Sequence, residues 1–298
     1  MWVTLALISA VFLGGYEICK KQSLNGNAVL PVLCLNTLIS SLLFLPFILL
    51  STFTDYLDGT LLYVPAASLA VHGHVFLKSV IVLSSWIFGY FSVKHLPLTL
   101  TGPIRATQPV MTLLGAMLIF GERLNPYQWI GVSLALLSLF LLSLTNKKEG
   151  NSQTDNRWMI FSTISMLLGA TSGLYDKYLM RSLDVMTVQV WFNFYQFGLM
   201  AIILMVLWYP QRRHSTPFVW KNSIIWISVF LAAGDWVYFY ALTFPDSMIS
   251  IVSMIRRSNV LITFIAGGLF FHEKHLKSKA FDLVLVLVGM FFLYWGTK

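Results

Sequence analysis

The sequence predicts an all-α membrane protein in which ten transmembrane helices form two inverted five-helix repeats. The first observation behind this prediction is composition: 57% of the residues are hydrophobic and 11% are charged, whereas soluble domains carry about 25% charged residues. The second is an internal repeat, in which a segment near the end of the chain resembles one near the middle. Each copy places an arginine inside an apolar run of membrane length.

Apolar runs recur along the whole chain, and each is long enough to cross about 30 Å of hydrocarbon as a helix of about 20 residues. Short loops with turn-forming residues separate these runs. We therefore expect a multi-pass protein of the cell (inner or plasma) membrane, embedded in the lipid bilayer and without a soluble domain. The ten expected spans are residues 2–20, 29–51, 73–93, 97–119, 126–145, 157–179, 186–208, 222–242, 247–271 and 278–296.

The internal repeat aligns residues 103–122 with residues 254–273 at a shift of 151 positions. We expect one five-helix repeat in residues 1–150 and a second in residues 151–298. Because each repeat has an odd number of spans, the two repeats should be inverted in the membrane. Secondary transporters with this architecture bind their substrate between the repeats, near the bilayer midplane. At this shift Arg105 aligns with Arg256, Gln108 with Asn259, and Glu122 with Glu273. Separate resemblances between the first and sixth spans and between the third and eighth spans match Tyr16 with Tyr175 and Trp86 with Trp236.

Three arginines lie at membrane depth, where a charge is costly to hold and usually has a function. Arg105 is about eight residues into its span, or about 12 Å along the helix axis, and Arg256 is equally deep from the opposite face. Both could bind an anionic substrate. Alternatively, Arg105 could pair with Glu17 and Arg256 with Asp176, which would hold helices together. Arg257 has no charged counterpart in the first repeat and is a further candidate ligand.

Asp235 lies in the middle of its span and aligns with a serine in the other repeat. It could neutralise Arg257, or it could be a carboxylate that couples transport to protons. Several aromatic side chains could line a cavity, although aromatics in membrane helices often pack or face lipid. These are Trp86, Tyr90, Trp236, Tyr238 and Tyr240, and the repeat-related Tyr16 and Tyr175 are further candidates for substrate contact.

Other polar residues favour structural roles. Lys78, His72 and His74 are expected at the membrane interface, where a lysine can extend its ammonium group to water. Glu122 and Glu273 are expected to pair with the next residue, Arg123 or Lys274, in short loops. Since no motif for a nucleophile, a phosphate loop or a metal site is present, we expect no enzyme activity, no cofactor and no metal.

The net charge of +8 would suggest a nucleic-acid partner in a soluble chain, but basic residues at membrane interfaces explain it here, and no nucleic acid is expected. Twelve cations flank the odd-numbered loops and five lie at the other face. The positive-inside rule then places the odd loops in the cytoplasm and both termini outside. The twelve are Lys20, Lys21, Lys94, Lys147, Lys148, Arg157, Arg212, Arg213, Lys221, Lys274, Lys277 and Lys279.

The junction of the fourth and fifth spans resembles the drug/metabolite transporter superfamily, in its EamA-type branch. A Gly-Glu-Arg-Leu-like turn followed by Gln-x-x-Gly is typical there, and this chain has Gly121-Glu122-Arg123-Leu124 followed by Gln128-Trp129-Ile130-Gly131. Gly14 and Lys21 keep the family's spacing in the first span, but Leu13 replaces the usual tryptophan. The second repeat is looser, with His272-Glu273-Lys274 and no matching glycine in the last span.

The resemblance implies a transporter or exchanger of amino acids, metabolites, nucleotide sugars or drugs, with cytoplasmic termini in many members, contrary to the charge count. Within the superfamily, the triose-phosphate translocators are similar in holding phosphate with basic residues on the helices equivalent to the fourth and ninth spans. We therefore expect a secondary transporter of a small organic anion, either a carboxylate or a phosphate ester. The alternatives are a proton-coupled exporter of amino acids or cationic drugs, using Glu17 or Asp235, and a lipid scramblase or membrane enzyme.

Overall fold

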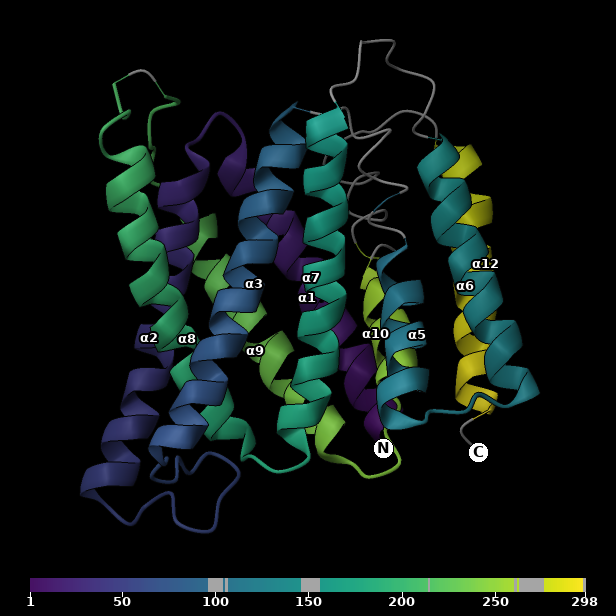
Figure 1. Cartoon of the computed structure of the whole chain (residues 1–298), viewed down its shortest axis with the longest axis horizontal. Helices are drawn as coiled ribbons and strands as arrows, with labels where there is room; N and C mark the ends of the chain where they lie inside the picture. The colour runs from purple at the N-terminus through teal and green to yellow at the C-terminus, as the bar shows by residue number, and fades with distance from the viewer. Residues whose placement is uncertain are drawn as a thin grey trace.

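The computed structural model describes residues 1–95, 104, 107–145, 156–213, 215–259, 262 and 276–296, and this part of the chain contains ten α-helices. Figure 1 shows them as upright rods, with both ends of the chain at the same end of the bundle. A five-residue π-helical turn, Leu204–Trp208, continues α8. The helices are α1 (Trp2–Leu24), α2 (Val29–Phe53), α3 (Leu69–His95), α5 (Gln108–Phe120), α6 (Pro126–Thr145), α7 (Asn156–Met180), α8 (Val185–Ile203), α9 (Ser223–Thr243), α10 (Ile249–Arg257) and α12 (Leu276–Trp295).

The ten-helix prediction is confirmed, and each helix coincides with one predicted span. The fourth and ninth spans are described only in part, as α5 and α10. Six helices in the described part are long and apolar enough to cross a membrane by length and composition: α1, α2, α3, α7, α8 and α9. A helix satisfies its own backbone N–H and C=O groups, which is why apolar runs adopt this form in hydrocarbon.

The packing of the helices follows the repeat. The first helix of each repeat packs against the third helix of the other, since α1 contacts α9 and α3 contacts α7. The second and fifth helices pack against their own counterparts, α2 against α8 and α6 against α12. In Figure 1, α1 rises from the end that holds the termini while α7 descends towards it. The repeats are therefore inverted, as predicted.

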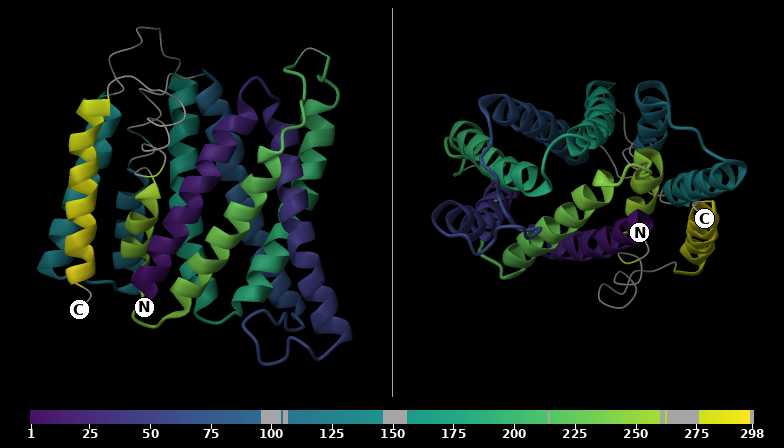
Figure 2. Two further views of the ribbon diagram at one scale, coloured as in Figure 1. Left: turned by 180° about the vertical axis from the view of Figure 1, so that it is seen from behind. Right: turned by 90° about the horizontal axis from the view of Figure 1, so that it is seen from below.

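The α6–α12 pair stands at one edge of the bundle, as Figures 1 and 2 show. A glycine on each helix allows the two backbones to approach closely. A Cβ atom built on Gly131 would lie 2.7 Å from the carbonyl oxygen of Gly289, and one on Gly289 would lie 3.0 Å from that of Gly131. Helices in lipid gain stability from such close contact, because the apolar driving force between them is weak.

The turn between α9 and α10 is bound to both repeats. Glu122 follows Gly121, whose positive φ of 65° ends α5. The Glu122 carboxylate accepts hydrogen bonds from the N–H groups of Ile249 (2.7 Å) and Ser250 (3.2 Å), and from the Ser250 hydroxyl. The predicted loop pair of Glu122 with Arg123 is therefore wrong, because the first N–H groups of α10 lie closer and carry the positive end of the helix dipole.

Lys177 of α7 holds the same turn from the second repeat. Its ammonium group is buried and donates hydrogen bonds to the carbonyl oxygens of Leu242 (3.1 Å) and Phe244 (3.3 Å), and to the Ser247 hydroxyl. The carbonyl groups at a helix C-terminus attract a cation. Together, Glu122 and Lys177 position the start of α10, the helix that carries Arg256 and Arg257.

Candidate functional site

A cavity of about 460 Å³ lies between the two repeats. Helices α1, α3, α5, α7, α9 and α10 all contribute to its lining, and α8 adds Phe192. The cavity extends from Asp176, deep in the bundle, to Lys20 and Leu24 at the end of α1. A smaller compartment of about 260 Å³ shares much of this lining and continues between α5, α7 and α10.

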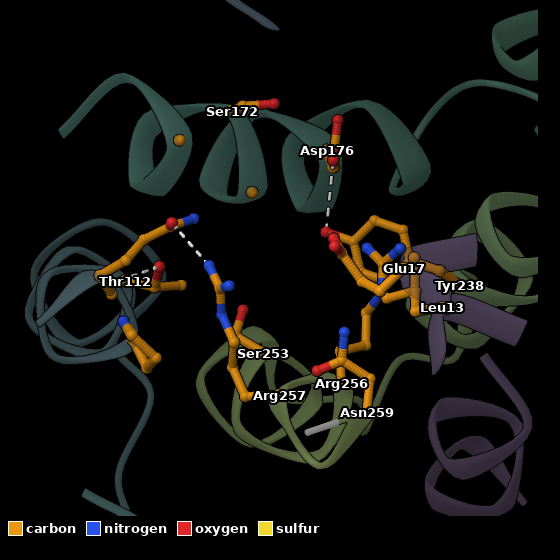
Figure 3. Close-up of a pocket in the computed structure, with 14 residues that line it drawn as sticks. Leu13, Glu17, Thr112, Ser172, Asp176, Tyr238, Ser253, Arg256, Arg257 and Asn259 are labelled. Carbon is orange, nitrogen blue, oxygen red and sulfur yellow. Dashed lines mark hydrogen bonds between the residues drawn. The ribbon is translucent and has the colours of Figure 1, made fainter. Parts of the chain in front are cut away.

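Arg256 and Arg257 both reach this cavity from α10 but have different partners. Arg256 donates a hydrogen bond of 2.7 Å to Asp235 Oδ1, and its guanidinium carbon lies 3.9 Å from the ring centre of Tyr238. Arg257 donates a hydrogen bond of 2.6 Å to Gln108 Oε1 on α5. In Figure 3, the two side chains rise from one helix and diverge, as expected of adjacent residues about 100° apart around its axis.

Two predicted pairings are therefore wrong. Arg256 pairs with Asp235 and not with Asp176, and Asp235 does not neutralise Arg257. The reason is the arrangement of neighbouring helices. Asp235 lies on α9 and faces Arg256 on α10, while Arg257 turns towards Gln108 on α5.

Asp176 instead forms a buried ion pair with Lys78. The ammonium group of Lys78 donates a hydrogen bond to Asp176 Oδ1 and lies 4.4 Å and 4.6 Å from the ring centres of Phe192 and Phe239. The Tyr238 hydroxyl donates a 3.3 Å hydrogen bond to the second carboxylate oxygen. Tyr238 thus contacts both the Lys78–Asp176 pair and the Arg256–Asp235 pair.

The prediction that Lys78 lies at the membrane interface is wrong, since its side chain is 2% exposed. Helix α3 begins at Leu69, four residues before the predicted start of the span. Lys78 is consequently about 13 Å from the start of the helix, at 1.5 Å per residue. A lysine at that depth is a candidate functional residue, and the start of α3 at Leu69 is the feature that places it there.

Glu17 lines the cavity, and its described partner is Lys20, one turn away on α1 at 3.2 Å. The alternative of a Glu17–Arg105 pair is not tested, because Arg105 lies outside the described residues. Among the described residues, no three histidine, cysteine, aspartate or glutamate side chains gather as metal ligands.

A comparison with protein-family models matches the EamA-like transporter family twice, over residues 1–144 and 156–295. The chain belongs to the EamA-like transporter family. This EamA protein is therefore a multi-pass membrane transporter with a small-molecule substrate, and not a member of an enzyme family. The predicted plasma-membrane location agrees with such a transporter, while the division at residue 150 stays a prediction.

A curated relative of this EamA transporter is a Lactobacillus johnsonii protein named "Putative sugar uptake protein". It is 22% identical over 242 residues, which cover 76% of this chain and 79% of the relative. A solved structure described only as "Crystal structure of protein" has a TM-score of 0.74 and 13% identity, and the match covers 98% of this chain and 95% of the other. That likeness supports the fold.

The sequence-predicted site residues of this EamA transporter divide into two groups. The cavity lining includes Tyr16, Trp86, Gln108, Asp235, Arg256 and Arg257, and the smaller compartment adds Asn259. The repeat-related pair Gln108 and Asn259 thus meets in one compartment.

Two predicted substrate contacts lie away from this lining. The Tyr175 hydroxyl pairs with His74 Nδ1 at 2.8 Å and its ring stacks on Tyr178. Trp236 directs its indole N–H to Met186 and stacks on Tyr240. Their aligned partners, Tyr16 and Trp86, do line the cavity, so the repeat symmetry does not extend to these side chains.

Proposed function

We propose that this EamA transporter moves a small organic anion, a carboxylate or a phosphate ester, by alternating access between its two repeats. The observation that carries the proposal is the pair of adjacent arginines, Arg256 and Arg257, whose side chains line the cavity between the repeats. A guanidinium group stays charged at any accessible pH and presents a planar fork that fits carboxylate or phosphate oxygens. The inverted repeats supply the two-fold related halves that rock around a central site.

The charge of the cavity supports an anion. Among the described residues, four cations and three carboxylates line it, which gives these seven residues a formal charge of +1. The cations are Lys20, Lys78, Arg256 and Arg257, and the carboxylates are Glu17, Asp176 and Asp235. A site enclosed by hydrocarbon favours a ligand that neutralises its charge, because uncompensated charge is costly there. An anionic group would offset this positive charge, whereas a cationic drug would add to it.

The size of the cavity supports a metabolite. About 460 Å³ falls within the range of roughly 300–1,000 Å³ that is typical of small-molecule sites. Tyr16 on α1 and Trp86 on α3 add aromatic surface to the lining that contains the arginines. A compound with an anionic group and a compact carbon skeleton would fit both surfaces.

A neutral sugar is the second candidate. It is favoured by the name of the Lactobacillus johnsonii relative and by the hydrogen bonds that hold Arg256 to Asp235 and Arg257 to Gln108. In that case the paired polar groups would bind hydroxyl groups while the aromatic side chains pack on the sugar ring.

The experiment uses compounds matched in skeleton and different in charge. Purified full-length protein would be tested by thermal shift and, after reconstitution in proteoliposomes, by uptake. One set is glucose, glucosamine, glucuronate and glucose 6-phosphate, and the other is glycerol, glycerate and glycerol 3-phosphate. We expect an acidic member of one set to raise the melting temperature and to be transported.

Each other outcome selects a different substrate class. Stabilisation and uptake of glucose or glycerol in preference to their acids would replace the anion with a neutral polyol. A response to glucosamine alone would favour a cationic substrate. Movement of fluorescent lipid without a gradient, with no response to any solute, would favour a scramblase.

A further inference from the structure

Three ion pairs among the described residues of the cavity differ in their access to water. In the Glu17–Lys20 pair the side chains are 39% and 26% exposed, and in the Asp235–Arg256 pair they are 20% and 19% exposed. In the Asp176–Lys78 pair they are 8% and 2% exposed. When a ligand displaces one member of an exposed pair, water can solvate the other. The Asp176–Lys78 pair also lines the cavity, but water reaches it poorly, so a ligand that separates the pair leaves one charge poorly solvated.

Among the described residues, charged and titratable groups face Asp176 from four neighbouring helices. Lys78 faces it from α3, Tyr238 and Asp235 from α9, Arg256 from α10 and Glu17 from α1. The ammonium group of Lys78 also lies against the rings of Phe192 and Phe239. Breaking such a pair leaves a buried charge uncompensated, which costs far more than losing a surface ion pair.

We propose that the Asp176–Lys78 pair is the proton-coupling site of the transporter, and that a proton on Asp176 releases Lys78 to the substrate anion. The proposal rests on the anionic substrate proposed above. When Asp176 is ionised, its carboxylate balances the charge of the Lys78 ammonium group, which then attracts an anion only weakly. With Asp176 protonated, the ammonium group of Lys78 is left without a counter-charge, and an anion that enters the cavity supplies the negative charge that Asp176 has lost.

The transfer of the proton balances. A proton from the water of the cavity binds a carboxylate oxygen of Asp176, forming an O–H bond, while Lys78 keeps its three N–H bonds. The carboxylate loses one negative charge and the substrate brings one. The buried set therefore has the same net charge before and after binding, and one proton accompanies each monoanion. Uptake of a monoanion is then electroneutral, and it is driven by a pH gradient but not by the membrane potential.

The Asp176–Lys78 ion pair joins one helix from each repeat, α7 and α3. Lys78 belongs to the third helix of the first repeat and Asp176 to the first helix of the second repeat, so the ion pair crosses the boundary between the halves. When a proton binds Asp176 and an anion binds Lys78, the direct ion pair between the halves is replaced by a contact through the substrate. The packing of the halves then changes only if proton and anion are both present, so their transport is coupled.

The experiment measures protons directly. Full-length protein in detergent and weak buffer would be mixed with the acidic compound that raises its melting temperature, for example glucuronate, and proton uptake would be followed with a pH indicator. We expect about one proton bound per monoanion. We also expect the affinity for the anion to fall by up to about tenfold per unit of rising pH, as linkage requires. Asp176→Asn should bind the anion without taking up protons, and its affinity should lose this pH dependence.

Further variants keep the proposal testable. In proteoliposomes, Asp176→Asn should exchange labelled for unlabelled anion but lose accumulation driven by a pH gradient. If the single variant does not fold, Lys78→Gln with Asp176→Asn removes both charges and should take up no protons. The matched control is Asp58→Asn, which removes an exposed carboxylate from the loop between α2 and α3 and should match the wild-type protein.

Anion binding by the wild-type protein without proton uptake would overturn the proposal. Proton uptake that persists in Asp176→Asn, or that is lost in Asp235→Asn instead, would also overturn it. A failure of the proposed function gives a different result, because no acidic compound would then raise the melting temperature, and the coupling proposal would fall with it.

Discussion

The guanidinium group of Arg256 donates a hydrogen bond of 2.7 Å to Asp235, so the arginine that the internal repeat aligns with Arg105 is bound by α9, the helix before its own. About a fifth of each side chain is exposed to the cavity. The pair is therefore accessible to a ligand, and an anion can compete with Asp235 for the guanidinium group.

The first prediction concerns this pair. Arg256→Lys keeps the charge and loses the fork, so it should weaken anion binding by about 1–3 kcal/mol, the scale of a charge-assisted hydrogen bond. The melting temperature in detergent should change little. The double change Arg256→Met with Asp235→Met should fold, because neither charge is left alone, but it should not transport the anion. Uptake that survives in the double variant would show that Arg256 has only a structural role.

The second prediction concerns the start of α10. Glu122→Ala removes the acceptor of two backbone N–H groups and a negative charge at a helix N-terminus, so it should destabilise the protein by about 0.5–2 kcal/mol. Thermal melting in detergent measures this loss. The melting temperature of Glu122→Gln should lie between those of Glu122→Ala and the wild-type protein. Arg123→Gln on the neighbouring residue is the control and should have little effect. Equal melting temperatures for Glu122→Ala and the wild-type protein would contradict the capping role.

The third prediction concerns the contact between α6 and α12. Gly131→Leu should separate the two helices, because even a Cβ atom there would meet the backbone of Gly289 at 2.7 Å. We expect a large loss of melting temperature, consistent with a cost of about 1–3 kcal/mol or more for overpacking. Gly198→Ala on α8 is the matched control, since no atom lies within 4 Å of its Cβ position, and it should be neutral or slightly stabilising. Equal tolerance of both changes would argue against close packing of α6 and α12.

The fourth prediction concerns orientation. Both ends of the chain lie at one end of the bundle (Figure 1), and the cavity extends towards the opposite end, to Leu24 of α1. The excess of cations in the odd-numbered loops predicts that this opposite end is cytoplasmic. Alkaline phosphatase fused to the C-terminus should then be active and a fluorescent protein dark. The reverse result would favour the orientation implied by the family resemblance and would place the cavity opening outside.

Much of this fold follows from the chain itself. The apolar runs predict the ten helices to within a few residues at most ends, because hydrocarbon requires every backbone polar group to be bonded within its own helix. The shift of 151 positions between Arg105 and Arg256 predicts two repeats, and an odd number of spans in each makes them inverted. These properties depend on local composition and on counting, so they need no knowledge of which helices are neighbours.

The partners of the buried charges were decided by the tertiary structure. The sequence placed Glu17, Asp176, Asp235 and the arginines at membrane depth, but it could not say that Arg256 meets Asp235 or that Lys78 meets Asp176. An ion pair depends on which helices adjoin and on their rotation about their axes, and hydropathy carries little information on either. Only the reciprocal packing of α3 on α7 and α1 on α9 brings the repeats together so that these charges compensate one another.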